Sequence, residues 1–270
     1  MLVLMLILSH RGINLAKRPS SFESSRIELL LRLKEGFSLE IDPLLLGDNN
    51  IVISHDDSLI RLLGIDKKLS KMRLEEAEDL GFISLPELLS ILDSYPQTLH
   101  ALHIKHFWSE NLESLIENLS STKKVFLFDL IPSVAKKIKD RLPHLELGAS
   151  VCHPYDISRF GKFTGNTLLS IDEFLEYGDL YTWAWLDEWD RMDLNGKEKA
   201  LYSIEVKEKL KGKKLAIVSP ELHRTSPGLL GGEVHPDSLE TRWEEIKKLN
   251  PDAICTDYPE YPFWGSGREA

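Results

Sequence analysis

The chain has 270 residues, of which 42% are hydrophobic and 28% charged, so it is long enough to bury a sizeable core as one large domain or two smaller ones. Its 33 Lys and Arg residues against 43 Asp and Glu residues give a formal net charge of −10. A general nucleic-acid-binding protein needs a basic face, so this balance argues against a nucleic-acid partner.

The apolar N-terminal run, residues 1–8, is either a targeting segment or a buried strand. It lacks a basic start and a small-residue cleavage site, and it reaches His10 well short of the roughly 20 residues that a membrane span requires. A buried parallel strand is the better interpretation. Cys152 and Cys255 lie far apart and show no zinc-type spacing, which fits a reducing compartment. The sequence therefore predicts a cytoplasmic protein without stable membrane insertion.

Eight apolar runs of strand length recur along the chain, and most of them precede an amphipathic, helix-like segment. The strand-like runs are residues 2–8, 37–42, 99–104, 124–129, 145–151, 180–186, 214–219 and 252–257. The second run continues through a turn-like stretch, 45–50, to a short extension at 51–54. The clearest helix-like segments are 21–36, 85–92, 131–142, 170–177 and 238–249.

This alternation predicts parallel strands joined by crossover helices. Eight such units in 270 residues indicate a closed (β/α)8 TIM barrel. An open doubly wound sheet is the alternative, but no Gly-x-Gly-x-x-Gly motif follows the first strand. Because no Pro/Ser-rich linker divides the chain, residues 1–270 are expected to form one domain, with 57–83 as an elaborated loop.

Barrel enzymes carry their sites at the carboxyl ends of the strands, and this chain has polar residues at most of those positions. They are His10 and Arg11; Glu40 and Asp42; His55 and Asp56 after the short extension; His103, Lys105 and His106; Asp129; Asp187 and Glu188; Glu221; and Asp257. One such residue is usually only solvated. Several on one barrel face indicate a functional cluster, because a packed barrel mouth has few unpaired places for charge.

The residue types indicate phosphodiester chemistry. Glu40 and Asp42 are two apart, so on a strand both point to one face, where two carboxylates suit Mg²⁺ or Ca²⁺. Two imidazoles, His10 and His55, can supply a general base and a general acid. Two cations, Arg11 and Lys105, match a phosphate. Together they predict metal-assisted cleavage of a small phosphodiester.

The motifs Ser-His-Arg-Gly after the first strand, Leu-Glu-Ile-Asp on the second and Ser-His-Asp-Asp after it resemble the glycerophosphodiester phosphodiesterase family. Leu-His-Ile-Lys on the third strand and Ala-Ile-Cys-Thr-Asp-Tyr-Pro-Glu near the C-terminus follow in the family's order. The resemblance implies a metal-dependent (β/α)8 barrel that hydrolyses deacylated phospholipids, an activity of lipid metabolism. It implies that His10 and His55 are the acid/base pair, that Glu40 and Asp42 bind the metal, and that Arg11 and Lys105 hold the phosphate.

The third strand departs from the family, which usually has Glu-Ile-Lys where this chain has His103-Ile104-Lys105. The missing Glu is a metal ligand in the family, and imidazole favours Zn²⁺ or Mn²⁺ over Ca²⁺. If His103 replaces that Glu as a metal ligand, the preferred metal is therefore Zn²⁺ or Mn²⁺. Asp187 and Glu221 are the other candidates for the missing ligand. Ile-Val-Ser-Pro-Glu-Leu-His on the seventh strand and Trp-Ala-Trp-Leu-Asp-Glu-Trp-Asp on the sixth resemble a divergent branch of the phosphatidylinositol phospholipase-like phosphodiesterase superfamily, from which the same Glu is absent. Members of that branch often accompany surface-polysaccharide genes, so the resemblance implies a phospho-sugar as a possible substrate.

Two alternatives to a metal-dependent hydrolase remain. A non-catalytic barrel that binds phosphate or a phospho-sugar would explain the loss of the third carboxylate. A metal-independent lyase would need an Arg in place of the metal, and Arg11 is the evident candidate. The retention of both His10 and His55 favours an enzyme, because binding alone needs no proton transfer. The sequence indicates no oligomeric state.

Overall fold

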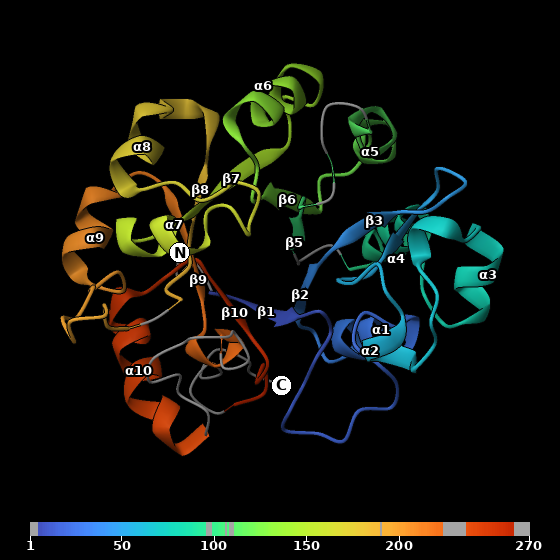
Figure 1. Cartoon of the computed structure of the whole chain (residues 1–270), viewed down its shortest axis with the longest axis horizontal. Coiled ribbons are helices and arrows are strands. Elements are labelled where there is room, and N and C mark those ends of the chain that lie inside the picture. The colour runs from blue at the N-terminus through green and yellow to red at the C-terminus, as the bar shows by residue number, and fades with distance from the viewer. Residues whose placement is uncertain are drawn as a thin grey trace.

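Eight parallel strands close into a barrel in the computed structural model (Figure 1). The structure describes residues 5–95, 99–105, 107, 111–189, 191–223 and 236–261. Around the barrel the order is β1 (Leu6–His10), β2 (Ser38–Ile41), β5 (His100–His103), β6 (Val125–Phe128), β7 (Glu146–Val151), β8 (Trp183–Leu186), β9 (Lys214–Val218) and β10 (Ala253–Thr256), which pairs with β1. Each predicted strand overlaps one of these, and the (β/α)8 barrel is confirmed; residues 2–4 and His106 lie outside the described residues.

Helices connect the barrel strands and surround the barrel (Figure 1). In chain order they are α1 (Arg26–Lys34), α2 (Ile60–Leu63), α3 (Leu74–Asp79), α4 (Leu85–Leu92), α5 (Leu112–Leu119), α6 (Pro132–Arg141), α7 (Pro154–Phe160), α8 (Ile171–Glu176), α9 (Ile204–Lys209) and α10 (Pro236–Leu249). In the described part of the chain, short 3₁₀ turns accompany them: η1 (Leu69–Lys71), η2 (Gly178–Leu180) and η3 (Pro220–His223).

The first helix begins later than the predicted residue 21. Ser25 is its N-cap and accepts a hydrogen bond from the backbone N–H of Glu28. The Glu28 carboxylate turns back and accepts hydrogen bonds from the backbone N–H groups of Ser20 and Ser21, at 2.5 and 2.8 Å. These two serines are therefore held outside the helix, which ends at Lys34 just before the predicted stop at Gly36.

The predicted extension of the second strand is instead half of a hairpin. The antiparallel strands β3 (Pro43–Leu45) and β4 (Ile51–Ile53) form a separate two-stranded sheet. The hairpin turns the chain back on itself, so that the backbone N–H of Ser54 donates to the carbonyl of Asp42 at 2.8 Å. Residue 55 therefore returns beside the end of β2 without lying on a barrel strand.

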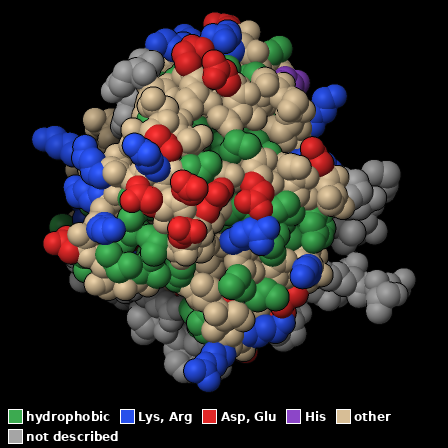
Figure 2. Space-filling view, turned by 90° about the vertical axis from the view of Figure 1, so that its right-hand side faces the viewer, with side chains coloured by type: hydrophobic (Ala, Val, Ile, Leu, Met, Phe, Trp, Pro, Cys, Tyr) green, Lys and Arg blue, Asp and Glu red, His purple; other side chains and the backbone are tan. Residues whose placement is uncertain are grey.

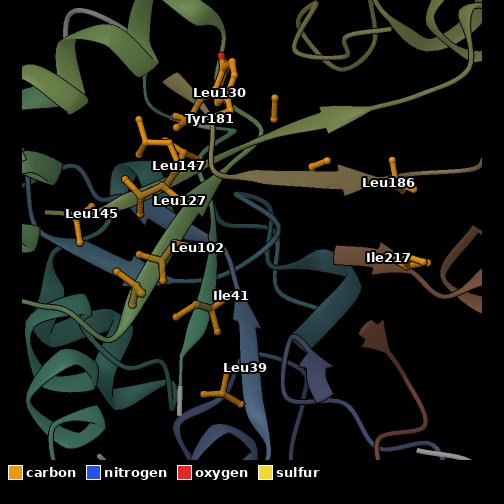
Figure 3. Packing of buried hydrophobic residues seen from close by; sticks show 14 of the residues in the cluster. Leu39, Ile41, Leu102, Leu127, Leu130, Leu145, Leu147, Tyr181, Leu186 and Ile217 are labelled. Atoms are coloured by element: carbon orange, nitrogen blue, oxygen red, sulfur yellow. The ribbon is translucent and has the colours of Figure 1, made fainter. Parts of the chain in front are cut away.

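Strand side chains alternate between two cores. Those that point inward fill the barrel and include the stacked pairs Phe126–Trp183 and Phe128–Trp185, with ring centroids 4.3 and 3.8 Å apart. Those that point outward pack against the helices, as Figure 3 shows for Leu39, Leu102, Leu127, Leu147, Leu186 and Ile217. Because side chains alternate along a strand, this pattern also decides which polar residues reach the barrel mouth.

Residues 57–83 contain α2, η1 and α3 and pack on the hairpin. Their apolar side chains join those of β3 and β4 in a small core, to which Leu44, Val52, Leu69, Met72 and Phe82 belong. This segment therefore carries short helices beside the part of the mouth near β2, and the described chain forms one domain around the barrel.

The surface reflects the acidic composition. On the face that contains the right-hand elements of Figure 1, acidic side chains gather near the middle, with basic side chains interspersed and around them (Figure 2). Among the described residues, no helix combines the length and apolar character needed to cross a membrane.

Candidate active site

The strand alternation brings the predicted residues to the inner rim of the barrel. His10 is the last residue of β1 and lies in register with Glu40 of β2, which in turn lies in register with Ala101 of β5. Ala101 belongs to the inner core, so His103, two residues further along, points the same way. Asp42 directly follows β2 and is fully buried.

Glu40, Asp42 and His103 form a compact group of metal-ligand types. One ligand atom from each lies within 4.8 Å of the others. His103 Nδ1 is 3.1 Å from Asp42 Oδ1 and 3.8 Å from Glu40 Oε1. The prediction that Glu40 and Asp42 share one face is confirmed by this geometry, and the third member of the group is the residue at the position of the missing family carboxylate.

This group fits a divalent cation. Glu40 Oε2 is buried and has no hydrogen-bond partner within the described part of the chain. A buried carboxylate oxygen without a donor is costly, and a cation would satisfy it. Burial and the negative charge of the neighbouring Asp42 raise the pKa of Glu40. A cation bound between the two carboxylates would offset this repulsion.

His103 is held from both sides by carboxylates. Its Nε2 lies 3.0 Å from Asp129 Oδ2, and its ring stacks on Phe128 with centroids 4.7 Å apart. Burial alone would lower the pKa of His103, but hydrogen bonds and charges from Asp129 and Asp42 outweigh it and raise the pKa to about 9. Asp129, which the sequence offers only as a polar residue at a strand end, thus contacts His103.

The two cations assigned to phosphate are engaged by carboxylates. Lys105 Nζ lies 2.9 Å from Asp42 Oδ1, and Arg11 Nε lies 3.6 Å from Asp42 Oδ2. Arg11 also donates through NH1 to Glu23 Oε1 at 3.1 Å. Although burial opposes ionisation, Lys105 and His103 hold the pKa of Asp42 well below its usual range. Both cations therefore border the candidate metal site.

His10 is oriented by a residue at the opposite end of the chain. Its Nδ1 lies 2.8 Å from Oδ1 of Asp257, which follows β10. The backbone N–H of Asp257 donates to Glu221 Oε1 at 3.1 Å, and the Thr256 hydroxyl donates to the same oxygen at 2.5 Å. Glu221, expected as an alternative metal ligand, is thus occupied in holding the β10 end in place.

His55 is oriented by its neighbour Asp56, whose Oδ1 lies 2.5 Å from His55 Nδ1. Burial lowers the pKa of His55 to about 4, and the positive charges of Lys105 and Arg11 act in the same direction. His10 therefore ends a barrel strand, whereas His55 lies in the loop that follows the β3–β4 hairpin.

The tryptophans on and after β8 pack against other aromatic rings. Trp183 and Trp185 fill the barrel, and Trp189 stacks on Phe160 with centroids 4.5 Å apart. The sequence did not identify Glu23, which pairs with Arg11, or Arg61, which pairs with Glu23 and Asp56, because these contacts depend on how separate segments fold together. The sequence places Asp257 at the end of the last strand without giving it a role. In a closed barrel the last strand pairs with the first, so a carboxylate at its end lies beside the end of the first strand.

Comparisons with known proteins find similarity in structure only. Neither the family models nor the curated proteins searched include a match to this chain. A glycerophosphodiester phosphodiesterase from Parabacteroides distasonis is 18% identical, with a TM-score of 0.64 over 95% of this chain and 94% of that chain. One from Thermotoga maritima is 16% identical, with a TM-score of 0.63 over 95% and 96%.

A third solved structure is a phosphodiesterase from Oleispira antarctica in complex with the product sn-glycerol-3-phosphate. It is 17% identical, with a TM-score of 0.60 over 95% of this chain and 94% of that chain. These similarities extend over nearly the whole chain at low identity, and they concern the fold. This chain has the (β/α)8 barrel fold of the glycerophosphodiester phosphodiesterases.

Proposed function

We propose that this chain is a metal-assisted phosphodiesterase that hydrolyses a small glycerophosphodiester or a related phosphodiester. The observation that carries the proposal is the pair of carboxylate-oriented histidines, His10 with Asp257 and His55 with Asp56, beside the buried Glu40–Asp42 pair. Two histidines, each oriented by a carboxylate, suit proton transfer at both ends of a displacement. The shared fold with proteins of this activity supports the same conclusion.

In the proposed reaction, the substrate hydroxyl next to the phosphoester attacks phosphorus and the alcohol leaves, which gives a cyclic phosphate. Water then opens the cyclic phosphate to the monoester, with the two histidines exchanging their acid and base roles. His55 accepts the proton of the attacking hydroxyl, because its lowered pKa keeps it neutral near pH 7. His10 gives a proton to the leaving alcohol through Nε2, since Asp257 engages Nδ1. Arg11 and Lys105 hold the phosphate oxygens, which compete with Asp42 for these cations.

Glu40, Asp42 and His103 are the residues that would hold the metal. A bound divalent cation would neutralise charge on the phosphoryl oxygens. The two carboxylates suit Mg²⁺ or Ca²⁺, whereas His103 as third ligand shifts the preference toward Mn²⁺ or Zn²⁺. The sn-glycerol-3-phosphate in the Oleispira antarctica structure supports a glycerol phosphate ester as the substrate class.

We also propose that residues 1–270 act as one unit, with 57–83 as an addition to the barrel mouth. The buried free thiols of Cys152 and Cys255 support the cytoplasm as the compartment. The substrate would decide between a role in lipid metabolism and a role in surface-polysaccharide metabolism. Identification of the leaving alcohol therefore comes first.

A second candidate is a non-catalytic phosphate-binding barrel. It is favoured by Asp42, which is already engaged by Lys105 and His103, two cations that can stand in for a metal. Such a barrel would bind sn-glycerol-3-phosphate without turning over any diester.

The decisive test is hydrolysis of a panel of glycerol and sugar phosphodiesters by EDTA-stripped protein, with Mg²⁺, Mn²⁺, Ca²⁺ or Zn²⁺ restored in turn. The matched control is the His10→Ala/His55→Ala double variant. Metal-restored turnover that the double variant lacks supports the hydrolase. Turnover in EDTA that the double variant lacks supports a metal-independent lyase. No turnover together with binding of sn-glycerol-3-phosphate by calorimetry supports the binding barrel.

A further inference from the structure

Arg61 lies outside the barrel, on the short helix α2 of segment 57–83, and its guanidinium bridges two carboxylates. Its NH2 and NH1 donate to the two oxygens of Glu23 at 2.5 and 3.1 Å. Its Nε donates to Asp56 Oδ2 at 2.5 Å. All three nitrogen atoms of the fork are thus used, with Glu23 held in the bidentate geometry that only an arginine provides.

Each of these carboxylates also holds a residue of the proposed site. Glu23 Oε1 accepts from Arg11 NH1 at 3.1 Å, and Asp56 Oδ1 lies 2.5 Å from His55 Nδ1. A chain of ion pairs therefore runs from Arg11 through Glu23 and Arg61 to Asp56, and the hydrogen bond between Asp56 and His55 completes it. This chain of contacts connects Arg11, which is proposed to bind the phosphate, to His55, which is proposed to accept the proton. None of its residues lies on a barrel strand.

We infer that Arg61 is a positioning residue that fixes the His55 ring and the Arg11 guanidinium relative to each other, an assignment that rests on the proposed function. His55 needs such a support because it follows a hairpin and not a barrel strand. Arg11, directly after β1, has a backbone φ of +53°, and its side chain is held by Glu23. The segment that carries α2 thereby contributes to the site through Glu23 and Asp56.

The charges explain why removal of Arg61 should disturb both ends. Glu23 and Asp56 approach the same guanidinium, and without it two carboxylates would face each other with less compensation. Glu23 would then keep only its ion pair with Arg11, and Asp56 only its hydrogen bond with His55, among the contacts described above. A base displaced by about 1 Å can cost roughly 100-fold in rate, so a change of this kind would be measurable in kcat.

Arg26 offers a matched control. It lies on α1 and donates through Nε and NH2 to Glu87 Oε1, at 3.0 and 2.8 Å. Its side chain is 49% exposed, against 50% for Arg61, and neither Arg26 nor Glu87 contacts a proposed site residue. If the Arg61 contacts are ordinary surface ion pairs, Arg61→Gln and Arg26→Gln will behave alike.

The experiment compares Arg61→Gln, Arg61→Lys and Arg26→Gln with the wild-type protein, using melting temperature as the check on folding. The first measurement is the titration of the His55 imidazole by NMR in EDTA, without substrate. The charged groups that act on His55 are Asp56, Asp42, Lys105 and Arg11, and they are retained in every variant.

We expect Arg61→Gln to raise the pKa of His55 above its wild-type value, because Asp56, which raises that pKa, would no longer be shared with Arg61 and the ring would be less tightly enclosed. We expect kcat to fall about 10- to 100-fold, with a smaller change in KM. Arg61→Lys should recover part of kcat, because it restores the charge and not the fork.

Equal His55 titrations in Arg61→Gln and Arg26→Gln, with kcat unchanged in both, would overturn the assignment. If the wild-type protein turns over no diester, the proposed function fails, and the NMR titration still decides whether Arg61 positions His55. An unchanged His55 pKa in folded Arg61→Gln and Arg61→Lys would then overturn the positioning role by itself.

Discussion

The Nδ1 atom of His10 lies 2.8 Å from Oδ1 of Asp257, which joins the end of the first barrel strand to the end of the last. The two residues are 247 positions apart in sequence and meet because β1 pairs with β10 to close the barrel. Closure of the fold therefore assembles a histidine–carboxylate pair that no local sequence pattern contains.

Asp257→Asn should lower kcat about 10- to 100-fold and change KM little. The amide can still meet Nδ1, but it no longer stabilises the ring while a proton is transferred. Steady-state kinetics on the diester that the wild-type protein cleaves best would measure the effect. Glu260→Gln is the control, because Glu260 is three residues away and pairs with Lys17. Equal kcat in both variants would contradict the orienting role of Asp257.

His103 predicts a pH dependence of stability. Its pKa in the folded protein, about 9, lies above the usual 6.5, so the folded state is stabilised by protonated His103 below pH 6.5. This contribution, at most about 3 kcal/mol, should be lost as the pH rises from 6.5 through 9. Denaturant unfolding in EDTA would measure it. His103→Gln should remove this decline, whereas His144→Gln, on the loop after α6, should keep it; a decline that persists in His103→Gln would refute the assignment.

Much of the fold is predictable from the sequence because it depends on local apolar patterning. A run such as 124–129 is strand-like whatever surrounds it, and eight such runs with intervening helices leave few topologies. The hairpin was misjudged because β3, with only three residues, continues almost directly from β2. Nothing in that continuous sequence marks the point where the chain leaves the barrel.

The site was predictable where strand position decides it, and unpredictable where loops decide it. His10, Glu40 and His103 follow from alternation along strands that close a barrel. The contact between Glu23 and Arg61 depends on how the segment before α1 meets the helix α2. Contacts of that kind depend on tertiary structure, so no spacing rule could have identified them.

Gly148→Ala should destabilise the barrel. A Cβ at Gly148 would lie 3.0 Å from Trp183 Cβ and 3.3 Å from Phe128 Cβ, inside the stacked aromatic core. Such overpacking costs about 1–3 kcal/mol. Urea unfolding would measure the change, and Ser94→Ala, on the exposed turn after α4, should have almost no effect. A stability equal to that of the wild-type protein would show that Trp183 can move aside.

Asp129→Asn should weaken metal binding about 10- to 100-fold, because the residue behind a metal-binding imidazole sets the ring orientation and its basicity. Asp129 Oδ2 lies 3.0 Å from His103 Nε2, on the side of the ring away from the nitrogen that faces Glu40 and Asp42. Calorimetric titration of EDTA-stripped, dialysed protein with Mn²⁺ and Zn²⁺ would measure the affinity. Asp172→Asn, at an exposed position of α8, is the control and should bind like the wild-type protein. Equal affinity in Asp129→Asn and Asp172→Asn would mean that His103 does not bind the ion, and Glu40 and Asp42 would then have to hold it without an imidazole ligand.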